Sequence, residues 1–222
     1  MICAPIIAAS SEEAVFKMAR ADPGADVLEI RLDLMASFHV KKLVQSASRP
    51  VIVTYRSKGE GGKGSAGVET RARYLMEAVH AGADFVDVEF SMPLSCRRKI
   101  FEGRGRTGII LSAHLLEGTP ARGKLEDLLR EMAATGAEKV KIVTRARAVE
   151  DNLRILNLIP LAQRLDVGII AFCMGPLGRI SRIASPVLGG DLTFAALSEG
   201  EESADGQLPL KEMKKILEVL SP

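Results

Sequence analysis

The chain has 222 residues, of which 47% are hydrophobic and 26% are charged, a composition that excludes a disordered chain and is sufficient for a large folded core. Its 30 basic and 28 acidic residues leave a formal net charge of +2, so we expect no broad basic surface for nucleic acid or an anionic membrane. Aromatic residues make up only 4% and tryptophan is absent, which argues against base-stacking platforms and favours a small-molecule partner.

Cysteine usage and the N-terminal segment predict a cytoplasmic protein. The three cysteines, Cys3, Cys96 and Cys173, are far apart and have neither metal-ligand nor redox spacing, which is typical of reduced thiols. The segment MICAPIIAAS is too short for a signal peptide and lacks its basic start, and no apolar run approaches about 18 residues. We therefore expect no bound metal and no membrane span.

Short apolar or alternating runs predict eight β-strands at a regular spacing. In chain order they cover residues 2–8, 26–34, 50–56, 84–90, 107–114, 139–145, 167–174 and 191–197. The segments between them have helical periodicity, which is clearest at 11–21, 70–82, 123–136 and 149–165 and less regular at 95–102 and 178–188. Gly82 and Gly136 stand at the ends of two of these helices, where a residue that accepts positive φ is favoured.

The strict alternation of strands and helices predicts a parallel sheet of the α/β class. Eight strand–helix units within 222 residues match a compact (β/α)8 TIM barrel. No linker rich in proline or serine divides the chain, and the glycine-rich segment 59–67 is long enough only for a loop, so we expect residues 1–222 to form a single domain. A doubly wound open sheet stays possible, because alternation alone does not show whether a sheet closes.

Polar residues at every second position of an apolar strand mark the side chains that would face a barrel interior. Glu29 and Arg31 alternate with leucine and isoleucine in the second predicted strand. Asp87 and Glu89 alternate with valine in the fourth. Because barrel active sites lie at the C-terminal ends of the strands, inward polar residues near those ends are the candidates for function.

Lys141 lies between Val140 and Ile142 in the sixth predicted strand. If these two neighbours pack beneath helices, Lys141 points into the barrel mouth. There, desolvation and the nearby cations Arg31 and Arg56 would disfavour its ammonium form, and a neutral amine is the nucleophile that forms an imine with a ketone or aldehyde. The alternative is a buried ion pair with one of the inward carboxylates, and the spacing alone leaves both interpretations open.

His114 ends the fifth predicted strand and Arg56 ends the third. A histidine at a strand end is often a hydrogen-bonded structural residue, but imidazole is also the side chain best suited to moving protons near neutral pH. His114 and Lys141 end neighbouring strands and would contact the same ligand. Together they suggest proton abstraction beside an imine.

Seven motifs in order along the chain resemble those of the type I 3-dehydroquinate dehydratases. They are ExR at 29–31, TYRSKGEGG at 54–62, DVE at 87–89, SAH at 112–114 with TP at 119–120, KVKI at 139–142, MGPLGRISR at 174–182 and SADGQ at 203–207. The resemblance runs through the whole chain and implies a TIM-barrel lyase that needs no cofactor. It also implies dehydration of 3-dehydroquinate to 3-dehydroshikimate in the shikimate pathway, and assembly as a homodimer.

The resemblance also implies a role for each matching residue. Lys141 would form a Schiff base with the substrate ketone, His114 would move protons beside it, and Glu60 would hold and polarise His114. Arg182 would bind the substrate carboxylate, for which a planar, two-pronged donor is well matched. The remaining substrate-binding residues would be Glu29, Arg31 and Arg56, which contact ring hydroxyls, and Ser203 and Gln207, which belong to a lid.

Two places depart from the family pattern. Leu115 and Leu116 follow His114, where the family usually has an acidic or amide residue and then an aromatic one. Asp205 stands where the family commonly has proline, so we expect a more mobile or less tightly closed lid. Neither departure removes a residue with a chemical role.

Three other functions compete with this interpretation. The segment GEGGKG at 59–64 matches the G-x-G-x-x-G pattern of dinucleotide sites and precedes a helix, although it follows the third strand rather than the first. A barrel without catalysis would bind the substrate without turnover. A Schiff-base aldolase would keep Lys141 but take a different ketone, whereas Arg182 and the motif SADGQ favour a carboxylated cyclic ketone.

Overall fold

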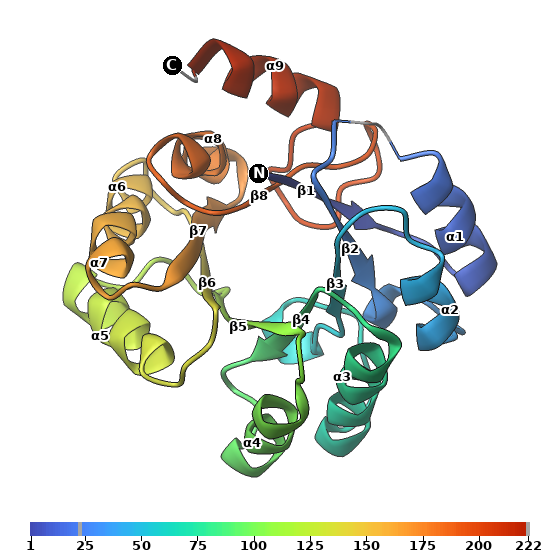
Figure 1. The fold of residues 1–222 in the computed structure, drawn as a ribbon. Coiled ribbons are helices and arrows are strands. Elements are labelled where there is room, and N and C mark those ends of the chain that lie inside the picture. The colour runs from blue at the N-terminus through green and yellow to red at the C-terminus, as the bar shows by residue number, and fades with distance from the viewer. Residues whose placement is uncertain (22–23, 221–222) are drawn as a thin grey trace.

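Eight parallel strands surround one axis, and the helices lie outside them (Figure 1). The computed structural model describes residues 1–21 and 24–220; the predicted domain 1–222 also includes 22–23 and 221–222, which lie outside the described residues. The strands are β1 (Ile2–Ile6), β2 (Val27–Arg31), β3 (Val51–Thr54), β4 (Phe85–Glu89), β5 (Gly108–Leu115), β6 (Lys139–Arg145), β7 (Gly168–Met174) and β8 (Thr193–Phe194). Their order is β7-β6-β5-β4-β3-β2-β1-β8, which confirms the predicted (β/α)8 barrel.

The ring closes between β7 and β8 with little strand pairing. β8 pairs with β1 at two positions. Within the described residues its link to β7 is a backbone hydrogen bond from Asp191 N to Ile169 O, 2.8 Å long. The predicted strand 191–197 is therefore too long: after β8 the backbone leaves the barrel, and Ala196 N donates instead to Leu208 O at 2.9 Å in the returning loop.

Helices alternate with the strands as predicted. Those of the described chain are α1 (Ser11–Ala19), α2 (Val40–Gln45), α3 (Val68–Ala81), α4 (Leu94–Gly103), α5 (Arg122–Ala133), α6 (Asp151–Leu156), α7 (Leu158–Arg164), α8 (Arg179–Val187) and α9 (Leu210–Leu220), with 3-10 turns η1 (Leu32–Leu34), η2 (Lys58–Glu60) and η3 (Pro176–Gly178). The first helix is capped by Ser10, whose Oγ accepts a hydrogen bond from Glu13 N at 3.4 Å. Across residues 1–21 and 24–220, no helix is long and apolar enough to cross a membrane.

Local chemistry explains where helices end and where predicted boundaries were wrong. Gly82 and Gly136 have φ of +88° and +78° after α3 and α5, as predicted for helix C-termini. The predicted helix 149–165 is two helices, because Pro160 has no N–H for the carbonyl of Leu156. The predicted strands 26–34 and 50–56 end early, at the last residues of β2 and β3.

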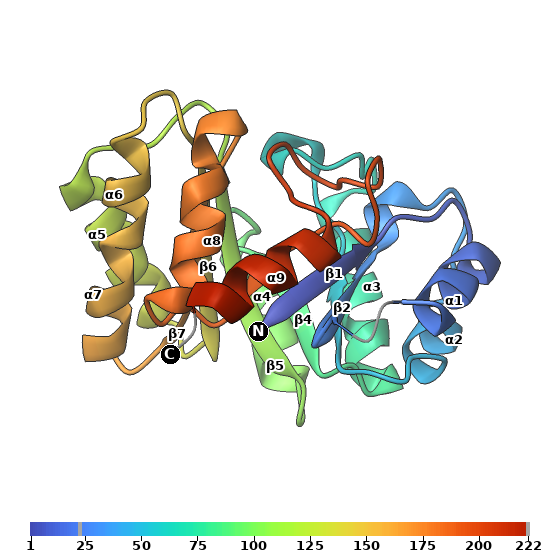
Figure 2. The same cartoon turned by 90° about the horizontal axis from the view of Figure 1, so that it is seen from above.

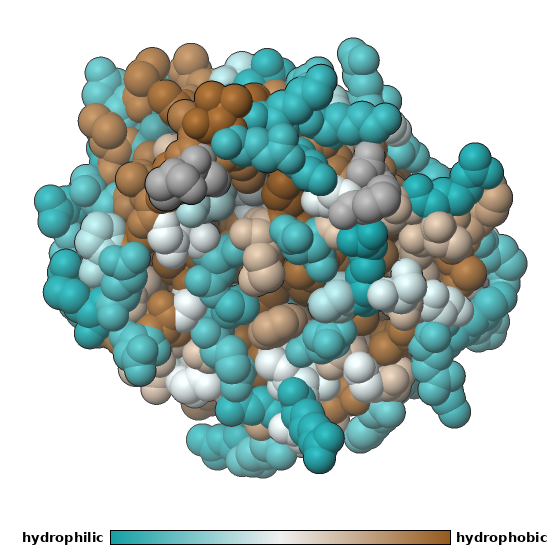
Figure 3. All heavy atoms as spheres, turned by 45° about the horizontal axis from the view of Figure 1, so that its top comes forward, coloured by the Kyte–Doolittle hydropathy of each residue, from teal (hydrophilic) through white to brown (hydrophobic). Residues whose placement is uncertain are grey.

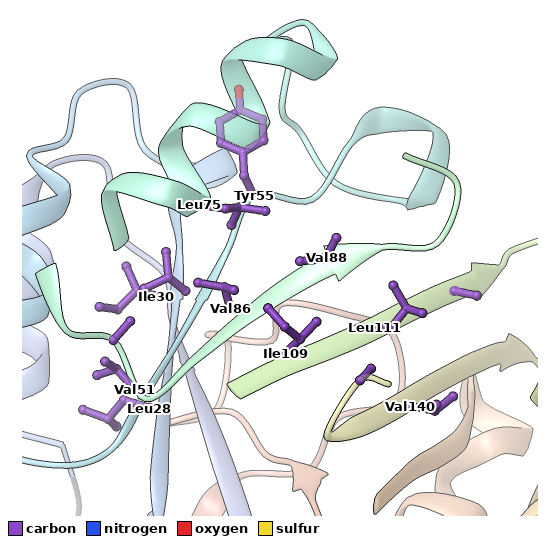
Figure 4. Packing of buried hydrophobic residues seen from close by; sticks show 14 of the residues in the cluster. Leu28, Ile30, Val51, Tyr55, Leu75, Val86, Val88, Ile109, Leu111 and Val140 are labelled. Atoms are coloured by element: carbon purple, nitrogen blue, oxygen red, sulfur yellow. The ribbon is translucent and has the colours of Figure 1, made fainter. Parts of the chain in front are cut away.

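Successive strand residues alternate between two buried layers. The outward layer packs beneath the helices and includes Val140 and Ile142, which turns Lys141 inward as predicted. Figure 4 shows part of this layer, with Val88 and Leu111 projecting from neighbouring strands. The inward layer is a separate apolar cluster within the barrel, made by Cys3, Val27, Ile52, Ile110, Val143, Ile170, Phe172, Met174, Leu192 and Phe194.

Replacing a side chain of the outward layer should lower the free energy of unfolding without changing any residue of the barrel mouth. Leu111 is fully buried on β5, so Leu111→Ala should lower the free energy of unfolding by about 2–5 kcal/mol through lost burial and a residual cavity. Urea denaturation measures this loss. Leu94→Ala, at a side chain that is 59% exposed at the start of α4, should stay within about 0.5 kcal/mol of the unchanged protein. Similar losses in both variants would contradict this description of the layer.

Candidate active site

One cavity at the C-terminal ends of the strands brings the predicted residues together. All of them line it: Glu29, Arg31, Arg56, Glu60, His114, Lys141, Arg182, Ser203 and Gln207. Figure 2 shows the loops after β3 and β8 at the same end of the barrel, and these loops contribute Glu60 and Ser203. Apolar side chains such as Phe172 and Phe194 complete the wall.

Lys141 lies buried in the middle of β6, with 5% of its surface exposed. Its Nζ is 3.2 Å from Asp87 Oδ2 and 3.7 Å from Glu29 Oε1, and it lies 4.2 Å from the centroid of the Phe194 ring. The nearest charged groups are therefore carboxylates rather than the arginines expected from the sequence. The ion pair that was left open as an alternative is present, and the same nitrogen also faces the cavity.

Asp87 connects Lys141 to the arginine at the end of β3. Its Oδ2 is 2.7 Å from Arg56 Nη2, and its Oδ1 accepts a hydrogen bond from Ser112 Oγ at 2.6 Å. Burial by itself would raise the pKa of Asp87, but the charges of Arg56 and Lys141 outweigh it and hold the pKa below its ordinary value. Asp87 is thus an anion shared by two buried cations.

Glu60 fixes the orientation of His114. Glu60 Oε2 is 3.1 Å from His114 Nδ1, and it also accepts hydrogen bonds from His114 N at 3.2 Å and Arg56 Nη1 at 3.3 Å. An oxygen with two such donors acts as an acceptor, so the network assigns the imidazole proton to Nδ1 and leaves a lone pair on Nε2. The other carboxylate oxygen, Oε1, accepts a hydrogen bond from Ser91 Oγ at 2.6 Å.

The pKa values of this pair are shifted in opposite directions. Burial, with Arg56 and Lys141 close by, lowers the pKa of His114 well below its ordinary 6.5, so the ring is neutral near pH 7. Burial raises the pKa of Glu60 from 4.5 to about 7, and Arg56 opposes this only in part. A neutral imidazole held by a carboxyl group is suited to accept a proton at Nε2.

The glycine-rich segment 59–64 places Glu60 rather than a phosphate group. Gly61 has φ of +84° directly after η2, and a Cβ at Gly62 would lie 2.2 Å from Arg56 O, so the chain folds back tightly on the end of β3. The next helix, α3, begins only at Val68. This geometry does not support the dinucleotide interpretation.

Arg182 is a buried cation on α8 whose donors are only partly used. Its side chain is 1% exposed, Nη2 donates to Asp205 O at 3.0 Å, and Nε has no hydrogen-bond partner among the described residues. The guanidinium carbon lies 4.5 Å from the centroid of the Phe172 ring, and burial lowers the pKa of Arg182 to about 10. A buried guanidinium with a free donor beside a cavity is suited to an anionic ligand.

The remaining predicted residues have partners within the site. Arg31 forms a two-pronged ion pair with Asp33, with Nε–Oδ1 and Nη2–Oδ2 distances of 2.8 and 2.9 Å. Ser203 and Gln207 bond to each other across the loop after β8, with Gln207 Nε2 donating to Ser203 Oγ at 3.0 Å. Sequence reasoning missed Ser91 as a partner of the site, and its place just after β4 was the only available signal.

The family model of the type I 3-dehydroquinases matches residues 2–222 of this chain. The chain belongs to this family. A 3-dehydroquinate dehydratase of Pyrococcus abyssi is 37% identical over 222 residues, which cover 99% of this chain and 98% of the relative. Another, from Syntrophobacter fumaroxidans, is 36% identical over 207 residues, or 89% of this chain and 88% of the relative.

Solved structures of 3-dehydroquinate dehydratases have the same fold. A type I 3-dehydroquinate dehydratase from Clostridium difficile, determined with covalently modified comenic acid, superposes with a TM-score of 0.87 at 26% identity, over 99% of this chain and 91% of that one. The 3-dehydroquinate dehydratase of Geobacillus kaustophilus gives a TM-score of 0.86 at 28% identity, over 99% and 90%.

After His114, where the chain departs from the type I family pattern, the imidazole is supported by Glu60 rather than by the residues that follow it. Leu116 lines the cavity, and its side chain would be in van der Waals contact with a Cβ at Gly61, 3.4 Å away. The polar contacts of the His114 ring and backbone go to Glu60 instead. Leu116 therefore adds an apolar wall to the cavity that holds His114, which Glu60 orients.

Ionisation of Glu60 should make stability fall as pH rises. Its folded-state pKa, about 7, lies above its ordinary 4.5, so the folded state binds this proton more tightly, and the stabilisation present below pH 4.5 is lost as pH rises through 7. Glu60→Gln cannot ionise. Its free energy of unfolding should therefore increase relative to the unchanged protein by about 1–3 kcal/mol between about pH 5 and pH 8.

Urea denaturation at the two pH values measures this difference. Glu77→Gln is the matched control, because the Glu77 side chain is 50% exposed on α3, and its stability should track the unchanged protein at both pH values. A Glu60→Gln variant that behaves like this control would show that Glu60 ionises normally.

Proposed function

We propose that this chain dehydrates 3-dehydroquinate to 3-dehydroshikimate through a Schiff base on Lys141, as a hydro-lyase of the shikimate pathway. The observation that carries the proposal is a buried lysine that shares one cavity with a neutral, carboxyl-held histidine, within a chain of the type I 3-dehydroquinase family. The reaction as proposed needs no cofactor, because the imine itself is the electron sink.

The reaction begins when the Lys141 ammonium gives up one proton and the resulting amine adds to the substrate ketone; that proton is taken by the ketone oxygen, which leaves as water, giving a protonated imine. His114 Nε2 then removes a proton from the adjacent carbon, and the electron pair moves into the imine to give an enamine. The enamine expels the β-hydroxyl, which takes a proton from His114 and departs as water. Hydrolysis of the new imine releases the product and restores Lys141.

The carboxylates around Lys141 suit both the ion pair and the Schiff-base reaction. A protonated imine carries its positive charge where the ammonium was, so Asp87 at 3.2 Å and Glu29 at 3.7 Å from Nζ would stabilise both species. The pairing therefore holds the nitrogen in place before and during catalysis. Lys141 is thus first the ammonium of an ion pair and then the nitrogen of an imine.

Arginines take separate roles in the proposal. Arg182 has an unpartnered Nε and binds the substrate carboxylate. Arg56 has its guanidinium engaged with Asp87, Glu60 and Ser112, so we assign it to holding the two carboxyl groups rather than to a ring hydroxyl as the resemblance implies. Arg31 and Glu29 remain the candidates for the ring hydroxyls, and Ser203 and Gln207 for a lid that excludes water.

Borohydride trapping tests the central step. Incubation with 3-dehydroquinate and borohydride should give a reduced adduct that peptide mass analysis places on Lys141, and Lys141→Arg should give none. Lys139→Arg is the matched control: Lys139 lies two residues away on β6, but pairs with Asp191 outside the cavity, so this variant should keep the adduct. A dinucleotide enzyme or an inert barrel would give no adduct, and an aldolase would be trapped by another ketone.

Removal of the imidazole should separate imine formation from proton transfer. His114→Ala should still give the borohydride adduct but lose about 100- to 10,000-fold in kcat, the usual contribution of general acid–base catalysis. His80→Ala, at an exposed position on α3, should retain normal turnover. Unchanged kcat in His114→Ala would remove His114 from the mechanism.

We also propose that the chain works in the cytoplasm as a homodimer. Its cysteines are buried free thiols, as suits a reducing compartment. Exposed apolar side chains gather on α6 and α8, including Leu153 and Ile180, which are 64% and 57% exposed. Figure 3 shows hydrophobic atoms at its upper left, the side on which Figure 1 draws these helices, and such a surface suits contact with a second copy.

Sedimentation should detect this assembly and its interface. The unchanged chain should sediment as a dimer, whereas Ile180→Glu, which places a charge on that surface, should shift the distribution to monomer. Phe16→Glu, at a side chain 59% exposed on α1, should remain dimeric. A monomeric unchanged chain would refute the homodimer.

A further inference from the structure

The loop after β8 is tied at its base and docked at its tip. At the base, Ala196 N donates to Leu208 O and Leu210 N donates to Ala196 O, at 2.9 and 2.8 Å. At the tip, a Cβ on Gly206 would lie 2.5 Å from Gly175 O, so the tip lies tightly against the turn after β7. Asp205, where the family commonly has proline, belongs to this docked tip.

Asp205 contacts three other elements of the barrel mouth. Its Oδ2 is 2.9 Å from Arg145 Nη2, at the end of β6. Its backbone carbonyl accepts hydrogen bonds from Gly175 N at 3.2 Å and from Arg182 Nη2 at 3.0 Å. One loop residue therefore joins the end of β6, the turn after β7 and the buried arginine of α8.

Arg182 depends on this carbonyl for its orientation. The carbonyl of Asp205 is the one hydrogen-bond acceptor that the described residues provide for its guanidinium, and no carboxylate there lies within 4 Å of it. The Phe172 ring supports the guanidinium at 4.5 Å but does not fix its rotation. A displaced Asp205 carbonyl would leave the buried cation free to turn away from a ligand.

We infer that the Arg145–Asp205 ion pair is a positioning device: it seats the loop tip so that the Asp205 carbonyl aims Arg182 at the substrate carboxylate. The inference rests on the proposed function, because it takes Arg182 as the carboxylate-binding group. It assigns Arg145 and Asp205 to substrate binding, without contact to the reacting atoms. In place of a proline, a charge pair holds the loop here.

The solvent exposure of the Arg145–Asp205 ion pair determines how strongly its loss changes KM and how strongly salt weakens it. The Arg145 and Asp205 side chains are 40% and 63% exposed, and ion pairs of this kind are weak and screened by salt. We therefore expect loss of the pair to raise KM for 3-dehydroquinate about three- to fivefold, with kcat unchanged within about twofold, since an interaction made equally in ground and transition states acts on KM alone.

Steady-state kinetics of Asp205→Asn and Arg145→Gln test the inference. Asp205→Asn keeps the backbone carbonyl and removes only the charge. Each single variant should show the raised KM, the double variant should be no worse than either single one, and all should lose the part of the salt dependence of KM that the pair supplies. Unchanged KM in both single variants, or additive effects in the double, would overturn the inference.

Lys17→Gln is the control for general loosening of the loop. Lys17 Nζ is 2.7 Å from Glu201 Oε1 on the first limb of the same loop, but neither residue contacts Arg182. This variant should keep its KM; an equal rise would mean that any loosening suffices and that the Asp205 carbonyl has no special role. Borohydride trapping in every variant separates the two proposals, because an adduct on Lys141 with normal KM values refutes the positioning role alone.

Discussion

The carboxylate of Asp87 is the contact on which the barrel mouth depends. It lies 2.7 Å from Arg56 Nη2 and 3.2 Å from Lys141 Nζ, and so joins the middle of β4 to the middle of β6 and to the segment that follows β3. A single unpaired charge inside the ring would cost several kcal/mol, so each of the three groups needs the others to remain buried. The same pairing holds Lys141 at a defined place in the cavity.

A second buried network sets the protonation of the site. Arg56 also approaches Glu60, Glu60 holds His114, and the shifted pKa values leave the imidazole neutral. The result is a cationic nitrogen and a neutral base on adjacent strands, separated in chemical role although they share one cavity. Imine formation beside a proton-transfer step requires two such groups, a lysine nitrogen and a separate base.

At the two places where the sequence departs from the family pattern, other contacts support the site. Leu116 forms part of the cavity wall while Glu60 supports His114. Asp205 in place of proline gives the loop a side chain that reaches Arg145, so the expectation of a looser lid does not follow from the loss of proline alone. In both places, this chain supports the site through contacts that differ from those the family pattern implies.

The sequence by itself determined the alternation of strands and helices and the inward direction of Lys141, because side-chain periodicity is a local property. The motifs shared with the type I family, rather than periodicity, identified Glu60, Arg182, Ser203 and Gln207. Only the tertiary structure decided that β8 is two residues long, that Asp87 and Glu29 rather than arginines are nearest to Lys141, and that Ser91 and Asp205 contact Glu60 and Arg182. Those outcomes depend on distances between segments far apart in the chain. Such distances follow from how the barrel closes and packs, which no local pattern contains.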